Sequence, residues 1–171
     1  MKEITYKELN MNPVDVIANE WVALVTGKNG DKVNAMTLSW GEMGSLWGHH
    51  SGMPVVTIYV RPQRFSKELL DKNEYFTLCF FGGKNMRELA YLGSHSGRDE
   101  DKIKKLNLHT TSNDDYSYIN EASTIFVCRK LYRQRMKEEC FLDKEVVNEF
   151  YPEKDFHDMY IAQIERIFVK E

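Results

Sequence analysis

The hydrophobic pattern of the chain is dominated by short runs of β-branched and aromatic residues separated by turn residues. The six substantial runs span residues 21–26, 32–40, 55–60, 75–81, 123–132 and 159–169. Each is rich in β-branched and aromatic residues and is bounded by turn-forming residues, which is typical of β-strands. Asn29-Gly30 lies between the first two runs and predicts a β-hairpin there.

Four short segments have helical patterns instead. Pro13 stands at the first helical position of one segment, and Asp99 is a predicted N-cap of the segment 99–106. The other two are residues 66–72, with Ser66 as a predicted cap and Phe65 and Leu70 at staple positions, and residues 85–92. A doubly wound parallel sheet needs a helix after nearly every strand, and the first three strands lack one. We therefore expect a mainly β fold with short helices, closed as a small antiparallel barrel.

Length and charge limit the function classes. The chain has 171 residues, and no linker or repeat divides it, so we expect one domain over residues 1–171. It carries 23 basic and 26 acidic residues, a net charge of −3, which argues against a broad electrostatic grip on nucleic acid.

We also expect a cytoplasmic protein with no membrane segment. The charged N-terminus has no apolar signal region, and glycines, histidines and Pro54 interrupt the uncharged run 43–60. The three cysteines, Cys79, Cys128 and Cys140, lack a C-x-x-C spacing, which indicates reduced thiols rather than a disulfide or zinc site.

One long window is almost free of charge. The 28 residues from Val33 to Val60 carry a single charge, Glu42, although the chain is 29% charged. Polar and apolar residues alternate over residues 34–41, and glycines follow. This surface suits a flat heteroaromatic ligand, since it offers apolar faces with few charges. The alternative is an edge strand and a glycine-rich loop, with Trp40 and Trp47 in the core.

Two further segments have the composition of anion sites. The first, Arg61-Pro62-Gln63-Arg64-Phe65-Ser66, places two arginines before a predicted helix N-terminus, where free N–H groups favour phosphate. The second is Ser94-His95-Ser96-Gly97-Arg98-Asp99, followed by Lys102. Surface arginines at a turn and an ordinary capped helix are the corresponding structural alternatives.

Metal and triad chemistry have little support. His49 and His50 are adjacent, so on a strand their side chains point to opposite faces, and no H-x-x-x-H spacing occurs. No G-x-S-x-G motif is present either. We therefore assign no metal ligand and no nucleophilic triad.

Together, the segments at 34–41, 61–66 and 94–102 resemble the flavin reductase-like family of FMN-binding split barrels, which includes flavoredoxin. The segment 155–161 is similar to the family's closing strand with its histidine. The resemblance covers residues 20–106 and 155–169, and residues 108–154 match weakly. It implies a six-stranded antiparallel split barrel that forms a homodimer and binds FMN near the subunit interface.

The resemblance also implies roles for individual residues. The isoalloxazine ring would lie on the segment 34–40, and the phosphate on the two anion segments. His157 and Tyr160 would lie near the redox face, and no catalytic residue is certain. Glu42 would bring a carboxylate close to the ring, where it disfavours anionic reduced flavin. The cofactor-binding residues implied in this way are Asn34, Ala35, Met36, Thr37, Ser39, Trp40, Arg61, Arg64, Phe65, Ser66, Ser96, Gly97, Arg98 and Lys102.

The resulting functional prediction is an FMN-dependent NAD(P)H:flavin oxidoreductase. NAD(P)H would bind transiently, because the chain has no G-x-G-x-x-G fingerprint. The acceptor would be a flavin or a protein. Two alternatives stay open: a non-catalytic flavin or electron carrier of the flavoredoxin type, and a barrel that binds an oligonucleotide through aromatic residues and arginines.

Overall fold

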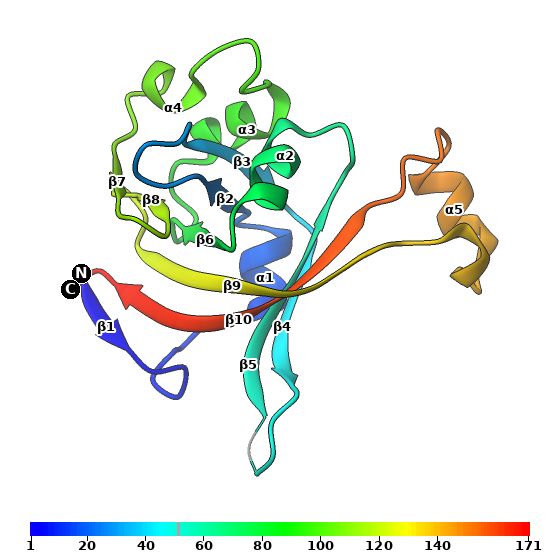
Figure 1. Ribbon diagram of the computed structural model, residues 1–171, viewed down its shortest axis with the longest axis horizontal. Coiled ribbons are helices and arrows are strands. Elements are labelled where there is room, and N and C mark those ends of the chain that lie inside the picture. Colours follow the sequence, from blue (N-terminus) through cyan, green and yellow to red (C-terminus); the bar gives the residue numbers. More distant parts are fainter. Residues whose placement is uncertain (51) are drawn as a thin grey trace.

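The computed structural model describes residues 1–50 and 52–171 (Figure 1). Its strands are β1 (Lys2–Ile4), β2 (Val22–Thr26), β3 (Asn34–Leu38), β4 (Gly41–Leu46), β5 (Met53–Val60), β6 (Tyr75–Phe80), β7 (Thr110–Ser112), β8 (Ser117–Ile119), β9 (Thr124–Arg135) and β10 (Asp158–Val169). Its helices are α1 (Pro13–Ala18), α2 (Phe65–Lys72), α3 (Met86–Ser94), α4 (Lys102–Lys105), α5 (Lys144–Phe150) and the 3₁₀ turn η1 (Glu138–Cys140).

One antiparallel sheet forms the body of the molecule. Its strand order is β3-β2-β6-β9-β10-β5-β4, and β1 pairs with β10. The two outer strands of this path, β3 and β4, are consecutive in the chain and are joined only by Ser39 and Trp40. The sheet must therefore curve until its edges meet, which gives a split barrel (Figure 1).

The hairpin predicted at Asn29-Gly30 is confirmed. β2 and β3 pair antiparallel in the register Val22↔Leu38 to Thr26↔Asn34. The turn is closed by a hydrogen bond from the Asp31 amide to the Lys28 carbonyl, and Gly30 has a φ of 81°. Glycine adopts this left-handed backbone without the penalty that a β-carbon brings.

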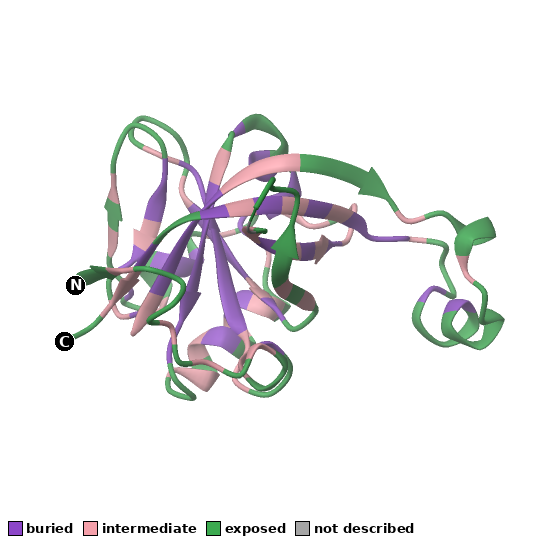
Figure 2. Ribbon diagram, turned by 90° about the horizontal axis from the view of Figure 1, so that it is seen from below, coloured by how far each residue is buried: buried purple, intermediate pink, exposed green. Residues whose placement is uncertain are grey.

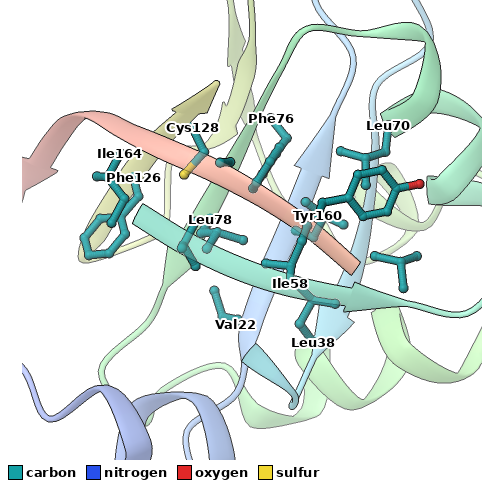
Figure 3. Packing of buried hydrophobic residues seen from close by; sticks show 14 of the residues in the cluster. Val22, Leu38, Ile58, Leu70, Phe76, Leu78, Phe126, Cys128, Tyr160 and Ile164 are labelled. Atoms are coloured by element: carbon teal, nitrogen blue, oxygen red, sulfur yellow. The ribbon is translucent and has the colours of Figure 1, made fainter. Parts of the chain in front are cut away.

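The curved sheet separates two apolar clusters. Inside the barrel, Val22, Ile58, Phe76, Phe126 and Tyr160 belong to one cluster of buried side chains (Figure 3). Successive residues of a strand point to opposite faces, so Ala23 and Val25 of β2 belong to the second cluster. Leu89 and Leu92 of α3 and Ile103 of α4 cover that outer face. Helices α3 and α4 are thus fixed against the outside of the barrel.

Strands β9 and β10 extend beyond the barrel as a two-stranded ribbon, and the segment 136–157 at its end is called the arm here (Figures 1 and 2). Val147, Tyr151 and Phe156 are its buried hydrophobic residues, with Met136 and Phe141 packed against them, and His157 is buried as well. Its other side chains are largely exposed, and Leu142 is fully exposed.

The predicted mainly β fold with an antiparallel sheet is confirmed, and all six predicted strands are present. The structure adds β1 and β4 to the sheet, a separate β7–β8 pair and helix α5. Strand β4 was not predicted, because its glycines and serine have low β-propensity. It forms through pairing with β5, from Gly41↔Ile58 to Leu46↔Met53.

Two predicted helix caps are wrong. Helix α2 begins at Phe65, so its N-cap is Arg64, and Ser66 lies inside the first turn. Helix α4 begins at Lys102, and its cap is Asp101, whose side chain accepts from the Lys104 amide, rather than Asp99. None of the helices in the described part of the chain is long and apolar enough to cross a membrane.

Candidate functional site

The two predicted anion segments meet in one cavity, called the cationic cavity here. It has a volume of about 200 Å³ and lies between β3, the start of α2 and the loop after α3. Its lining residues are Asn34, Met36, Gln63, Arg64, Phe65, Ser66, Leu92, Ser94, His95, Ser96, Gly97, Arg98 and Lys102. Nine of the predicted cofactor-binding residues are among them, although they come from three separate segments.

The charges of this cavity are all positive. Arg64 Nη1 donates to the Gly93 carbonyl at 2.7 Å, and Lys102 Nζ donates to the Leu92 carbonyl at 2.7 Å. Both acceptors lie in the last turn of α3, where unpaired carbonyls favour cations. Arg98 donates to the Gln63 carbonyl at 3.0 Å and pairs with Glu68, which is outside the lining. No aspartate or glutamate of the described residues lines the cavity. It is therefore suited to an anion.

Lys102 is the most buried of these cations, with 3% of its surface exposed. Burial, and secondarily the charge of Arg64, lower the pKa of its ammonium group to about 8. An anion placed between Arg64 and Lys102 would offset both effects, because it supplies the missing opposite charge.

Close packing holds the floor of the cavity. Asn34 Nδ2 donates to Ser66 Oγ at 2.7 Å and so links β3 to α2. A β-carbon at position 97 would overlap the Asn34 side-chain oxygen and would lie 3.0 Å from the Phe65 ring. Glycine at 97 is therefore required for the loop to approach β3 this closely. Arg98 lies over the same Phe65 ring, at 5.3 Å from its centroid.

Four lining residues were not among the predicted site residues: Gln63, Leu92, Ser94 and His95. His95 stacks on Tyr91 of α3 with ring centroids 3.6 Å apart. Gln63, Ser94 and His95 belong to the segments that the sequence singled out, so position within a motif was the available signal.

A second cavity, called the aromatic cavity here, lies between α1, the β3–β4 link, β5 and the arm. Its volume is about 420 Å³. Its lining residues are Val14, Ile17, Ala18, Ser39, Trp40, Gly41, Glu42, Tyr59, Met136, Phe141, Val146, Phe150 and Tyr151. Of the predicted cofactor-binding residues, Ser39 and Trp40 are here, beside Glu42.

Trp40 joins this cavity to the predicted histidine. Its ring lies 4.8 Å from the His157 ring and 5.6 Å from the Phe150 ring, the latter nearly perpendicular at 82°. His157 is buried, and its Nδ1 lies 2.8 Å from the Tyr151 hydroxyl. Burial, and then the charge of Arg61, lower the pKa of His157 to about 4, so the imidazole is neutral at neutral pH.

Glu42 is exposed, and its carboxylate points to β5 rather than to a cation. The Tyr59 hydroxyl donates to Glu42 Oε1 at 2.6 Å. The hydrogen bond joins the two strands at the mouth of the aromatic cavity, so the lone charge of the window 33–60 belongs to that cavity's lining.

Besides His157, four predicted residues line neither cavity. Ala35 has no exposed surface and packs in the outer cluster, and the Thr37 hydroxyl donates to the Leu89 carbonyl. Both lie on the face of β3 that α3 covers, because strand side chains alternate. Tyr160 is fully buried in the barrel, and its hydroxyl donates to Asp71 at 2.6 Å.

Arg61 is the fourth, and it holds the arm. Its guanidinium donates to Asp155 Oδ2 at 2.5 Å and to the Phe150 carbonyl at 2.8 Å, and lies 5.2 Å above the Tyr151 ring. The two arginines of the segment 61–66 thus have different partners: Arg64 faces the cationic cavity, and Arg61 faces away from it.

The arm supplies the residues that sequence reasoning missed: Met136, Phe141, Val146, Phe150 and Tyr151. Their segment matched the family motifs weakly. The recurrence of aromatic residues along it was the signal that could have indicated a packed, ligand-facing surface. No group of three or more His, Cys, Asp or Glu side chains is placed to hold a metal ion in residues 1–50 and 52–171.

Comparisons with known proteins agree with the predicted resemblance. The family model described as "Flavin reductase like domain" matches residues 19–171. The fold is similar to flavoredoxin of Desulfovibrio vulgaris (Miyazaki F), with a TM-score of 0.66 and 17% identity over 100% of this chain and 78% of that chain. It is also similar to flavoredoxin from Methanosarcina acetivorans, with a TM-score of 0.64 and 15% identity over 96% and 76%.

A third similar structure is the styrene monooxygenase flavin reductase from Pseudomonas putida S12, with a TM-score of 0.60 and 16% identity over 88% of this chain and 79% of that chain. A comparison with curated proteins finds no match. The predicted family is confirmed, and at these identities the solved structures establish the fold alone.

Proposed function

The chain belongs to the flavin reductase-like family, and from this premise we propose that it binds FMN and acts as an NAD(P)H-dependent oxidoreductase. The acceptor of the electrons would be a flavin or a protein. An electron carrier of the flavoredoxin type is the second candidate, because flavoredoxins and a flavin reductase resemble this fold to a similar degree.

The observation that carries the FMN proposal is the convergence of Arg64, Arg98 and Lys102 on a cavity without a lining carboxylate among the described residues. A phosphate monoester is the end of FMN that needs such donors. The cavity volume of about 200 Å³ is below the roughly 300 Å³ at which pockets begin to enclose drug-sized ligands. It would therefore hold the phosphate end, with the ring outside.

The remaining parts of the cofactor have candidate positions on the same side of β3. Asn34 and Met36 share one face of the strand, and Trp40 follows in the link to β4. When bound, FMN supplies a ring that accepts hydride from a nicotinamide. The protein's task is then to orient the reactants and exclude water, which agrees with the absence of a nucleophilic motif in the sequence.

His157 would be a polar group beside this ring surface. Its neutral imidazole packs on Trp40 and is oriented by the Tyr151 hydroxyl, which lies 2.8 Å from Nδ1. Because burial keeps it neutral, it would act as a hydrogen-bonding group rather than as a cation.

The phosphate assignment is tested by comparing FMN with riboflavin, which lacks the phosphate. Arg64→Ala is expected to lower the affinity for FMN by about tenfold or more, which is the value of a lost charge-assisted hydrogen bond. The affinity for riboflavin is expected to fall much less. Arg87→Ala, an exposed arginine on α3, is the matched control. Equal losses for both ligands in Arg64→Ala would contradict the assignment.

Absorbance separates the wider alternatives. A colourless preparation that also fails to take up added FMN would contradict both flavin proposals. If FMN binds, anaerobic mixing with NADH and NADPH is expected to bleach the flavin absorbance. Absence of bleaching with either nucleotide would favour the carrier.

We also propose that two copies associate. Leu46 and Trp47 are 39% and 48% exposed on the β4–β5 hairpin, and Leu142 and Val146 are exposed on the arm. A second copy could bury these apolar side chains, which are scattered over two projecting elements. Light scattering during gel filtration would show twice the chain mass of 20.1 kDa, and a monomer would contradict this part.

A further inference from the structure

We propose that the aromatic cavity is a binding site for a compact organic cation with an apolar body, such as a benzyl-substituted ammonium ion. The proposal concerns a second site and requires no flavin. It is carried by the chemistry of the lining, in which five aromatic rings surround a single carboxylate: Trp40, Tyr59, Phe141, Phe150, Tyr151 and Glu42.

The rings form walls that can face a cation. Trp40 and Phe150 are nearly perpendicular, with centroids 5.6 Å apart, and Phe141 and Tyr151 are inclined at 59° and also lie 5.6 Å apart. The face of an aromatic ring is negative, so a cation would lie over the faces of these rings that stay accessible. Trp40 and Phe150 are 39% and 38% exposed, which leaves part of each ring accessible to a ligand.

Glu42 supplies a negative charge in the lining, which would attract a cation but not a neutral aromatic molecule. Among the residues that the structure describes, Tyr59 is the only side chain that donates to Glu42, and no lysine or arginine forms an ion pair with it. The hydrogen bond to Oε1 orients the carboxylate on the cavity lining. Its negative charge therefore stays available to a bound cation.

No basic residue of the described chain lines the cavity. Arg61 lies over the Tyr151 ring and is paired with Asp155. The rest of the lining is aliphatic or thioether: Val14, Ile17, Ala18, Val146 and Met136. These groups select an apolar body, whereas the cationic cavity, lined by Arg64, Arg98 and Lys102, selects the opposite charge.

The volume is consistent with a small molecule. At about 420 Å³ the aromatic cavity lies inside the range of roughly 300 to 1,000 Å³ that is typical of ligand sites. It is built from α1, β4, β5 and the arm, so the ligand would also contact the arm.

The test compares a cation with a neutral molecule that has the same ring. Calorimetric titration with benzyltrimethylammonium and with benzyl alcohol is carried out on the purified protein without FMN, because Trp40 also belongs to the proposed ring position. We expect the cation to bind at least tenfold more tightly than the alcohol. Similar affinities, or no binding of the cation, would overturn the proposal.

Two variants assign the binding to this cavity. Glu42→Gln keeps the shape of the side chain and the acceptor for Tyr59 but removes the charge. It is therefore expected to lower the affinity for the cation about tenfold and to leave the affinity for the alcohol unchanged within twofold. Phe150→Leu is expected to weaken the cation by several-fold. Glu149→Gln, an exposed carboxylate next to Phe150 that does not line the cavity, is the matched control. A loss in Glu149→Gln equal to that in Glu42→Gln would mean general electrostatics and would overturn the assignment.

The outcome is separable from that of the proposed function. A protein that takes up FMN but shows no preference for the cation overturns only the second site. A protein that binds the cation but no FMN overturns only the flavin proposal.

Discussion

Gly97 lies against Asn34 so closely that no side chain can be added at position 97 without displacing the Asn34 amide. That amide donates to Ser66 Oγ at 2.7 Å. Because Gly97 has no side chain, this hydrogen bond between the segments 34–41 and 61–66 can form beneath the segment 94–102. The three segments are separated by about thirty residues each in the sequence, and this contact is where they meet.

Gly97→Ala is therefore expected to weaken FMN binding by about tenfold or more while the chain stays folded, because overpacking moves Asn34 and Ser66. Quenching of flavin fluorescence measures the affinity. Gly44→Ala is the control, because a β-carbon there meets nothing within 4 Å. An unchanged affinity in Gly97→Ala would show that the cavity does not hold the cofactor.

Affinity for FMN should fall as the pH rises from 7 to 9. The pKa of Lys102 is lowered to about 8, so its ammonium group loses its proton in this range, while the phosphate stays doubly ionised. We expect a loss of about tenfold, the value of one charge-assisted hydrogen bond.

Two variants locate the source of this pH dependence. Lys102→Met should weaken FMN at pH 7 and remove the slope, whereas Lys104→Met, an exposed lysine of the same helix, should keep it. A slope that persists in Lys102→Met would assign the titration to another group.

His157 should make the protein less stable in weak acid. Its folded-state pKa of about 4 lies below the unfolded value of 6.5, so the unfolded chain binds more protons between these values. The contribution is present above pH 6.5 and is lost as the pH falls toward 4.

For a shift of this size the loss between pH 7 and pH 5 is about 2 kcal/mol. Urea unfolding at both pH values measures it. His157→Gln should reduce the pH dependence by that amount, and His50→Gln, an exposed histidine, should not. Identical pH dependence in the wild type and His157→Gln would mean that the imidazole is not buried in solution.

Arg61 should control the mobility of the arm rather than the phosphate. Arg61→Met removes hydrogen bonds to Asp155 and the Phe150 carbonyl. We expect amide hydrogen exchange in residues 144–157 to accelerate about tenfold or more, with little change in β6. The matched control is Arg129→Met, which breaks an ion pair with Glu165 away from the arm. Unchanged exchange in the arm would contradict this role.

The extent to which sequence predicted this molecule depended on the kind of interaction. The six strands followed from local runs of β-branched and aromatic residues bounded by turn residues, because such runs are recognisable without any knowledge of strand pairing. Strand β4 did not, since Gly41, Gly44 and Ser45 carry no such pattern and the strand exists only through pairing with β5.

The site residues also differed in how far the sequence predicted them. Arg64, Ser66, Gly97 and Lys102 were found because their segments have the local chemistry of anion sites, and tertiary packing brings them together. Arg61 has the same local chemistry as Arg64, but its partners are in the arm, more than eighty residues later. Such a choice of partner depends on three-dimensional contacts that motif spacing does not encode.

The two-residue link between β3 and β4 has a mechanical consequence. Within the described strands, the path ends at β3 on one side and β4 on the other, so no ladder of hydrogen bonds closes the seam between them. A separation of β3 from β4 would break none of the strand pairings of the sheet, and Trp40 lies in the link between these two strands. Such a separation would widen the aromatic cavity beside Trp40, whereas Arg64 and Lys102 are held by hydrogen bonds to carbonyls of α3.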